Sequence, residues 1–428
     1  MLHKKASVLA VASAFAMIFG ARNADAAAFA LYEQGASGLG NAYAGAAAVA
    51  EDATTAWWNP AGMSWLPAGM HLSGAAALID PSTKFSNRAS TPAVIPPAPP
   101  RPLGDEGGDA GSSVVLPSLF FATNIGPKWN VGMVINVPFG LKTEYDSTWI
   151  GRFQGIKAEV KTVNFNPSVA YRVNDALSVA GGVSYMRGEI DLVSAVNLGL
   201  AEAQNHTNVD GDGWGFNLGV LAKVGPQTRL GAHYRSSVDF KLDGDTNFTA
   251  PAPAILNSNV KLDVKTPANL AVSAAHRLND QLELLGDITW WQWSKVDRLP
   301  LERTSGPLSG TTLDTLVLHL KDTWRLSAGV NYKLSGTLTL KGGVAYDQTP
   351  VRSADERTVR LPDSDRYWLS AGLKWAVSRN GALDFGYSYV NFKDADINNN
   401  QTLLGRGTVN GTYNAKVHVF GVQYQQTF

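Results

Sequence analysis

The sequence contains no cysteine among its 428 residues. Disulfides and thiolate metal ligands are therefore excluded. Charged residues make up only 17% of the chain, against roughly 25% in soluble globular proteins. Lysine and arginine together number 36, as do aspartate and glutamate, so the formal net charge is zero. Because a nucleic-acid-binding domain normally carries a basic excess, we expect no nucleic-acid partner.

Long apolar runs are missing as well. Beyond residues 1–26 no stretch approaches the roughly 20 apolar residues that a membrane-spanning helix needs. Residues 1–26 themselves are typical of a secretory signal peptide, with a basic start at His3 to Lys5, an apolar run over 6–21 and a small-x-small cleavage site at Ala24 to Ala26. The alternative is a short N-terminal membrane anchor. We predict a mature chain that begins at Ala27.

Apolar and polar residues alternate through most of the remaining chain. In residues 161–173 one face of the predicted strand carries Val163, Phe165, Val169 and Tyr171, and the other carries Asn164, Asn166, Ser168 and Arg172. Strand side chains alternate between faces, so one face is apolar and the other wet. A soluble β-sandwich alternates in the same way. Strands that often exceed ten residues, behind an export signal, instead favour a bacterial outer-membrane β-barrel.

Two kinds of connection alternate along the chain, and together they predict the strand number. Tight turns are expected near 126–127, 174–175, 225–226, 279–280, 335–336 and 380–381, and long polar loops near 81–112, 140–157, 193–210, 243–258, 298–311, 351–363 and 396–410. These six turns and seven loops make thirteen connections and hence fourteen strands. Even strand numbers, short periplasmic turns and long outer loops are typical of outer-membrane barrels. We predict an all-β, antiparallel transmembrane barrel over residues 69–428.

Residues 27–68 differ from the rest because they are rich in alanine and glycine and show no strand pattern. A barrel of fourteen strands is wide enough to leave a lumen. We expect this segment to form short helices and turns that plug the lumen, with a defined turn at Asn59 and Pro60. The alternatives are a simple surface turn at Asn59 and Pro60, and an open porin.

Two further features lie within the predicted strands. Pro138 follows an apparent strand and Gly140 comes shortly after it. Proline cannot donate to a strand ladder, so a break here would have to be lined by protein or a cavity; alternatively, Pro138 begins an outer loop. Trp290, Trp291 and Trp293 lie where a strand would reach the outer membrane interface, which tryptophan prefers. Ordinary core aromatics are the other interpretation.

Residues for catalysis do not gather in any recognisable motif. The seven histidines are scattered without an HxxxH or HExxH pair, and no GxSxG sequence occurs. A phospholipase would need serine and histidine brought together by the fold, which sequence alone does not exclude. We expect no enzyme activity, no cofactor and no metal site.

The segment 27–63 resembles the N-terminal plug of the FadL family of outer-membrane long-chain fatty acid and hydrocarbon transporters. The likeness includes an Asn-Pro-Ala element at Asn59, Pro60 and Ala61. Further similar segments follow in order at 138–153, 164–183, 319–330 and 361–375. The resemblance implies a fourteen-strand barrel closed by a hatch over residues 27–68.

The resemblance also implies functional residues. Phe29, Arg187 and Lys321 match positions near the ligand pocket of the family, and a kink at Asn136, Pro138 and Gly140 matches an inward bend of the third strand that opens the wall. Alternation places Lys321 on the lumenal face with Thr323 and Arg325. Arg187 shares the phase of the lipid-facing residues, so a bulge near Gly188 or a place at the outer interface is needed. The alternative for Arg187 and Lys321 is a solvated barrel charge.

The function expected from this resemblance is passive uptake of hydrophobic molecules, with long-chain fatty acids as the leading substrate. Capture at the outer loops, binding in the lumen, movement of the hatch and lateral exit would follow in turn. Aromatic or alkane hydrocarbons are the alternative substrates, and a general porin or a structural adhesin the alternative functions. We expect a monomer in contact with outer-membrane lipid and lipopolysaccharide.

Overall fold

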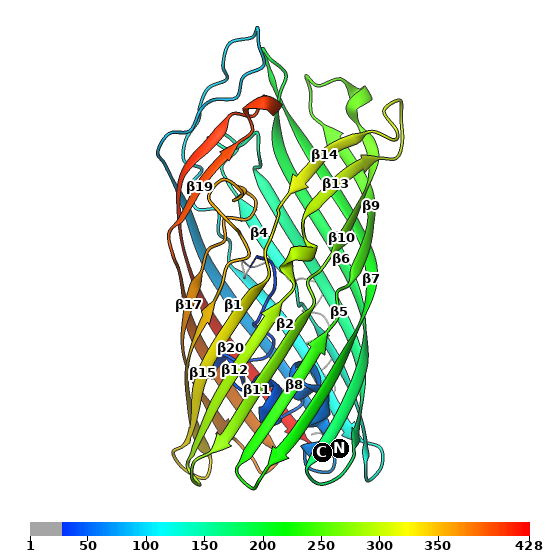
Figure 1. Ribbon diagram of the computed structural model, residues 1–428, viewed down its shortest axis with the longest axis vertical. Coiled ribbons are helices and arrows are strands. Elements are labelled where there is room, and N and C mark those ends of the chain that lie inside the picture. The colour runs from blue at the N-terminus through cyan, green and yellow to red at the C-terminus, as the bar shows by residue number, and fades with distance from the viewer. Residues whose placement is uncertain (1–27) are drawn as a thin grey trace, which may run out of the picture.

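The structure is a computed structural model that describes residues 28–428. The predicted signal peptide lies outside the described residues. Figure 1 shows a tall barrel with tight turns at the lower end, where the C-terminus also lies, and long loops at the upper end. Among residues 28–428 no helix is long and apolar enough to cross a membrane.

Fourteen strands form a closed antiparallel ring, as predicted. Each strand pairs with the next one in the ring, and the last pairs with the first from His71 opposite Thr427 to Asn87 opposite Gly411. In ring order the strands are β1 (Met70–Asn87), β2 (Val114–Asn124), β3 (Trp129–Asn136), β5 (Lys157–Arg172), β6 (Leu177–Asn197), β7 (Glu202–Val224), β8 (Thr228–Arg235), β11 (Asn269–Arg277), β12 (Leu282–Trp291), β15 (Thr323–Lys333), β16 (Leu338–Asp347), β17 (Arg366–Ala376), β18 (Gly381–Phe392) and β20 (Thr408–Thr427).

Shorter strands extend the wall at the end that carries the long loops (Figure 1). They are β4 (Gly140–Glu144), β9 (Asp239–Phe248), β10 (Ser258–Lys265), β13 (Arg298–Arg303), β14 (Thr312–Val317) and β19 (Ala395–Asn400). Three 3-10 turns lie in the same region: η3 (Ala254–Leu256), η4 (Trp293–Lys295) and η5 (Thr402–Leu404). Several predicted loops are therefore partly strand, because neighbouring segments continue the ladder beyond the fourteen-strand ring.

The outer surface of the ring is apolar and the inner surface is largely polar. Large side chains that point outward include Val169, Trp214, Leu218, Val272, Ile288, Leu326, Val344, Leu369 and Phe420. Their neighbours along each strand face inward and are buried, such as Ser168, Asn217, Ser273, Asp287 and Ser370. This pattern is what a wall surrounded by lipid requires, because the apolar face meets hydrocarbon and the polar face meets the lumen.

Residues 28–68, here called the hatch, lie inside the ring. They form η1 (Leu39–Asn41), α2 (Ala46–Val49), α3 (Thr55–Trp58) and η2 (Pro60–Trp65). η1 contacts β15 to β18, α2 contacts β8 and β11, α3 contacts β2 and β3, and η2 contacts β3, β5, β6 and β7. The hatch therefore touches strands around the ring, and most of its side chains are buried.

Glycines in the wall allow the hatch backbone to approach closely. A Cβ added at Gly343 of β16 would overlap the backbone of Asn41, and one at Gly231 of β8 would overlap the carbonyl oxygen of Ala47. Lys341 of β16 also holds the hatch. Its ammonium group donates to the carbonyl oxygen of Ser37 at 2.8 Å and pairs with Glu51 at 3.5 Å. The hatch is thus fitted to the wall by both shape and charge.

We predict that Gly343→Ala loosens the hatch without disturbing the barrel. The added methyl has no room beside Asn41, and overpacking typically costs roughly 1–3 kcal/mol. The protein should still migrate as a heat-modifiable barrel on gels, while its conductance in planar bilayers rises. Gly286→Ala in β12 is the matched control, since an added Cβ there meets nothing within 4 Å. Equal conductance in the two variants would contradict this prediction.

Candidate functional site: a wall break beside an apolar cavity

The third strand of the ring is interrupted at the predicted position. The ladder between β3 and β5 stops at Asn136 opposite Asn164 and resumes at Gly140 opposite Lys161. Three residues of one strand, 137–139, therefore face two of the other, as in a β-bulge. The Thr162 hydroxyl spans the break, accepting from the Phe139 N–H at 3.1 Å and donating to the Phe139 carbonyl oxygen at 2.7 Å. Pro138 has no N–H to leave unpaired.

The interrupted segment turns toward the lumen. All residues from Val134 to Leu141 are buried, so the in-out alternation of the strand is lost there. Its backbone pairs instead with residues 28–34, the N-terminal segment of the hatch. The Leu31 N–H donates to the Pro138 carbonyl oxygen at 2.9 Å, and the Gly140 N–H donates to the Phe29 carbonyl oxygen at 2.8 Å. The Gln34 side chain donates to the Val137 carbonyl oxygen at 2.7 Å.

The inward turn leaves a gap in the strand pairing, here called the window. The ladder between β2 and β3 ends at Leu119 opposite Ile135. Above that pair, the next backbone hydrogen bond that the described residues make between the two rims runs from the Glu144 N–H to the Ala110 carbonyl oxygen at 3.1 Å. Pro117 of β2 lies on the rim, where a missing N–H is tolerated because the strand has an edge. One apolar cluster inside the wall includes residues at this gap and in the N-terminal segment: Leu31, Tyr32, Val114, Leu116 and Val137.

A large cavity lies above the hatch, toward the long loops. It comprises about 1500 Å³ of space between protein atoms, part of it open to solvent. Its apolar lining comes from several strands and from the hatch, and includes Phe29, Leu141, Val160, Ile190, Leu192, Leu299 and Leu316. Phe29 is 9% exposed and meets Trp293 edge-on at 4.8 Å and Phe139 at 5.8 Å between ring centroids. Phe29 thus lines the cavity, and its role in substrate binding stays a prediction.

Charged side chains also line this cavity. The Arg360 guanidinium donates to the Lys157 carbonyl oxygen at 2.8 Å, and burial lowers the pKa of Arg360 to about 10. Arg406 pairs with Asp314 at 3.0 Å, and His319 lies 3.4 Å from Asp297. The cavity therefore combines apolar walls with a small number of polar and charged groups, which is the usual composition of a ligand site.

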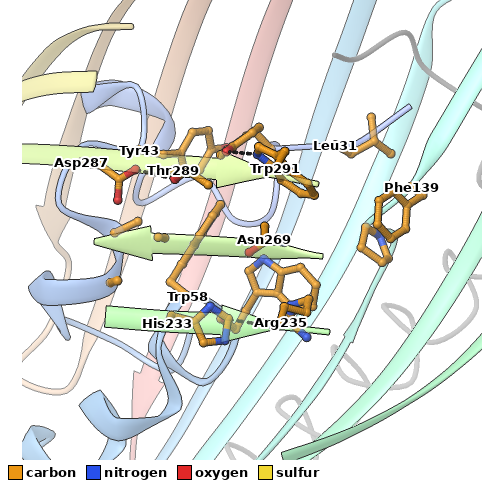
Figure 2. A pocket seen from close by; sticks show the side chains of 16 residues that line it. Leu31, Tyr43, Trp58, Phe139, His233, Arg235, Asn269, Asp287, Thr289 and Trp291 are labelled. Atoms are coloured by element: carbon orange, nitrogen blue, oxygen red, sulfur yellow. Dashed lines mark hydrogen bonds between the residues drawn. The ribbon is translucent and has the colours of Figure 1, made fainter. Parts of the chain in front are cut away.

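A smaller cavity lies next to the N-terminal segment, below the ring pair of Phe29 and Phe139. It comprises about 600 Å³ and is lined by Leu31, Tyr32, Pro138, Phe139, His233, Arg235, Asn269, Asp287, Thr289 and Trp291, among others. Figure 2 shows its side chains converging from β8, β11 and β12 and from the hatch. The Trp291 indole N–H donates to the Tyr32 hydroxyl at 2.8 Å.

The tryptophans of this region correct one sequence prediction. Trp293 is 1% exposed and packs on Phe29, and Trp291 lines the smaller cavity. An interfacial position is therefore wrong for these two residues. The chain leaves the strand after Trp291 and enters η4, which carries Trp293 back over the lumen.

The predicted basic residues lie away from both cavities. Arg187 is on the outer face of β6 with a 68% exposed side chain, and it pairs with Asp210 at 2.7 Å. The β6–β7 register is regular through Gly188, so the bulge that a lumenal Arg187 needs is absent from these strands. Lys321 precedes β15 and is exposed, and its N–H donates to the Pro350 carbonyl oxygen at 2.9 Å. Their roles in substrate binding stay predictions, and neither residue lines a cavity described above.

The Asn-Pro-Ala element joins the hatch to the wall. The Asn59 side-chain amide is fully buried and donates to the carbonyl oxygens of Ala47 and Val220, at 2.7 and 2.8 Å. Its side-chain oxygen accepts the Ala61 N–H, and Pro60 begins η2. The Ser178 hydroxyl then donates to the Ala61 carbonyl oxygen at 2.8 Å. The element is therefore a buried tie between hatch and barrel; the surface-turn alternative is wrong.

Buried charges around the N-terminal segment were not identified from the sequence. Arg366 binds Asp347 through two nitrogens, at 2.6 and 3.0 Å, and Arg325 is fully buried nearby. Glu33 of the hatch is 4% exposed. Burial raises the pKa of Glu33 to about 7, although Arg366 and Arg325 oppose the shift. The alternation pattern marks Arg325 and Arg366 as lumenal, but only the folded hatch shows that they are covered.

Comparison with known proteins places the chain in a family. The sequence model for "Outer membrane protein transport protein (OMPP1/FadL/TodX)" matches residues 17–428. The chain belongs to this family. It is 30% identical to outer membrane protein P1 of Haemophilus influenzae over 97% of the chain and 98% of that protein. It is 27% identical to the long-chain fatty acid transport protein of Escherichia coli, over 98% of each.

Solved structures agree with the fold. A Pseudomonas aeruginosa FadL homologue superposes with a TM-score of 0.86 at 25% identity, covering 94% of this chain and 100% of that one. The Ralstonia pickettii toluene transporter TbuX superposes with a TM-score of 0.69 at 20% identity, covering 92% and 98%. The protein is therefore an outer-membrane β-barrel of a family that transports hydrophobic compounds.

We predict that the N-terminal segment is held more tightly in acid. Burial raises the pKa of Glu33 to about 7 and that of Asp363, a loop residue, to about 6. The docked hatch therefore favours the neutral acids. Docking becomes less stable as pH rises from about 4.5 to 7, and its stability then levels off. For Glu33 the change is on the order of 3 kcal/mol.

Hydrogen exchange of residues 28–34 in the detergent-solubilised protein measures this effect, after correction for the intrinsic pH dependence of exchange. Protection should decrease between pH 5 and pH 7. Glu33→Gln, which cannot ionise, should show a much flatter profile. A native profile that stays flat over this range would refute the role assigned to Glu33.

Proposed function

We propose that this protein takes up long-chain fatty acids passively across the outer membrane. The observation that carries the proposal is the position of an apolar cavity directly above a window in the barrel wall, with the N-terminal segment between them. A ligand held in the cavity would contact Phe29, whose carbonyl oxygen is bonded to the wall break. Displacing this segment would join the cavity to the window.

The cavity supports an amphiphilic substrate. Burying hydrocarbon stabilises a complex by roughly 0.8 kcal/mol per CH₂, so apolar walls alone hold an acyl chain. Arg360 and Arg406 line the same cavity and offer cations for a carboxylate. Release then follows from the gradient of the substrate, and the proposal assigns the protein no catalytic step.

The runner-up is uptake of monoaromatic hydrocarbons. Phe29 lines the cavity and packs on the rings of Trp293 and Phe139 behind it, and an aromatic lining of this kind would suit a flat ring. Solved relatives described as toluene transporters share the fold. Growth of a deletion strain complemented with this protein, on oleate in one culture and on toluene in another, compares the two substrate classes directly.

We predict that Arg360→Gln weakens oleate binding by up to about tenfold while leaving toluene binding nearly unchanged. A charge-assisted hydrogen bond contributes roughly 1.5–3 kcal/mol when shielded and less when wet, and a tenfold change corresponds to about 1.4 kcal/mol. Lys321→Ala is the comparison variant, because Lys321 lies outside this cavity. Isothermal titration with both ligands measures the effect. Parallel losses for oleate and toluene would indicate altered packing and reject the head-group role.

We predict that deleting Pro138 closes the window. Removing one residue from 137–139 leaves two residues opposite 162–163, so the β3–β5 ladder can run without interruption. Uptake of labelled oleate into proteoliposomes should then fall strongly, whereas binding in the cavity persists. Deleting a residue of the exposed turn 125–128 serves as a control for loss of a residue in the same hairpin. Undiminished uptake by a folded Pro138 deletion would eliminate the window as the exit.

A further inference from the structure

A buried arginine on the lumenal wall has unused hydrogen-bonding groups. Arg325 of β15 is fully buried. Its Nη2 donates to the carbonyl oxygen of Ala42 in the hatch at 2.9 Å, but Nε and Nη1 have no partner among the described residues. A buried donor without a partner is unfavourable, and more so when it is charged. A guanidinium in this state is therefore suited to receive an anion.

The neighbouring carboxylates are already bound to other groups. Asp347 lies opposite Arg325 in the ladder, but it accepts two hydrogen bonds from Arg366. Asp287, on the adjacent strand, accepts from the hydroxyls of Ser273 and Thr289. The wall itself therefore leaves part of the Arg325 fork unbound.

Further buried donors without partners lie around Arg325. They are the Thr323 and Ser327 hydroxyls, which follow the same lumenal face of β15, and the indole N–H of Trp368. The Trp368 ring lies 5.4 Å from the Arg325 guanidinium, and its strand position is level with Ser327 through Ala345. Arginine and tryptophan side chains have donors and no nitrogen acceptor. This cluster of donors matches the lone pairs of a carboxylate.

The N-terminal segment covers this cluster. The Tyr32 ring lies 4.2 Å from the guanidinium of Arg325. Tyr32 and Trp368 belong to one apolar cluster that also includes Leu116 and Val137 at the window. Movement of residues 28–34 away from the wall break would therefore uncover Arg325 on the side that faces the window. It would also remove Glu33, the nearby hatch carboxyl, whose Oε2 has no partner among the described residues.

We propose that Arg325, with Thr323 and Trp368, forms a second binding site for the carboxylate of an aliphatic acid, used while the acyl chain leaves through the window. The inference rests on the proposed function. It adds a polar binding site that the substrate would reach after it leaves the large cavity. A carboxylate there would accept from Nε or from Nη1, which lie on different edges of the guanidinium, and from a neighbouring donor such as the Thr323 hydroxyl or the Trp368 indole N–H. An uncharged chain of the same length would gain nothing from this site.

The test compares oleate with oleyl alcohol in proteoliposomes that contain the full mature protein. Arg325→Gln should lower the influx of labelled oleate at least tenfold relative to oleyl alcohol, and Arg325→Lys should restore part of it. Thr323→Val and Trp368→Phe remove single neutral donors without removing a charge, and each should lower the same ratio several-fold. These milder variants keep the test valid if Arg325→Gln fails to fold.

Arg235→Gln is the matched control. Arg235 is also a buried lumenal arginine beside the hatch, but two of its nitrogens bond to Ser184 and to the Trp57 carbonyl oxygen. Its replacement should change both influxes alike. Two results would overturn the second site without contradicting the proposed function. One is an oleate-to-alcohol influx ratio that stays unchanged in every Arg325, Thr323 and Trp368 variant. The other is an equal loss of oleate and oleyl alcohol influx. Native protein that moves neither compound would instead overturn the proposed function.

Discussion

The backbone of the interrupted third strand is the constraint on which the rest of the structure depends. A barrel wall in lipid has no water to satisfy an N–H or a carbonyl oxygen, so each group that leaves the ladder needs another partner. Here the partners are Phe29, Leu31 and Gln34 of the hatch. This one exchange of hydrogen bonds accounts for three features: the position of the N-terminal segment, the inward turn of residues 137–139, and the gap in strand pairing between β2 and β3.

The same few residues therefore serve several features. Phe29 contributes its ring to the floor of the large cavity and its carbonyl oxygen to the wall break. Leu31 and Tyr32 belong to the apolar cluster at the window and line the smaller cavity. One short segment, residues 28–34, therefore contacts both the large cavity and the wall break. The remainder of the hatch is held separately, by Asn59, by Lys341 and by close approach to wall glycines.

The buried charged side chains in the lumen are of two kinds: those in ion pairs, and those with hydrogen-bonding atoms that have no partner among the described residues. Several buried ions have an ion-pair partner, such as Arg366 with Asp347 and Lys341 with Asp384. Such pairs are weak evidence for stability, since desolvation offsets much of their attraction. Unused donors on Arg325 and the raised pKa of Glu33 are different, because each marks a group that the resting structure leaves incompletely satisfied. Both lie where the N-terminal segment meets the wall.

The sequence by itself determined the barrel and its strand number, and it marked Pro138 as either a break in the third strand or the start of an outer loop. Alternation has a period of two residues, turn dipeptides mark the strand ends, and proline cannot donate to a ladder, so each of these signals is local. Phe29 and the Asn-Pro-Ala element came from family resemblance. The tertiary structure alone decided that Trp293 packs on Phe29 and that Arg325 contacts the N-terminal segment. Those outcomes depend on the hatch and on loops that return into the lumen, and such contacts between distant segments leave no periodic trace in the chain.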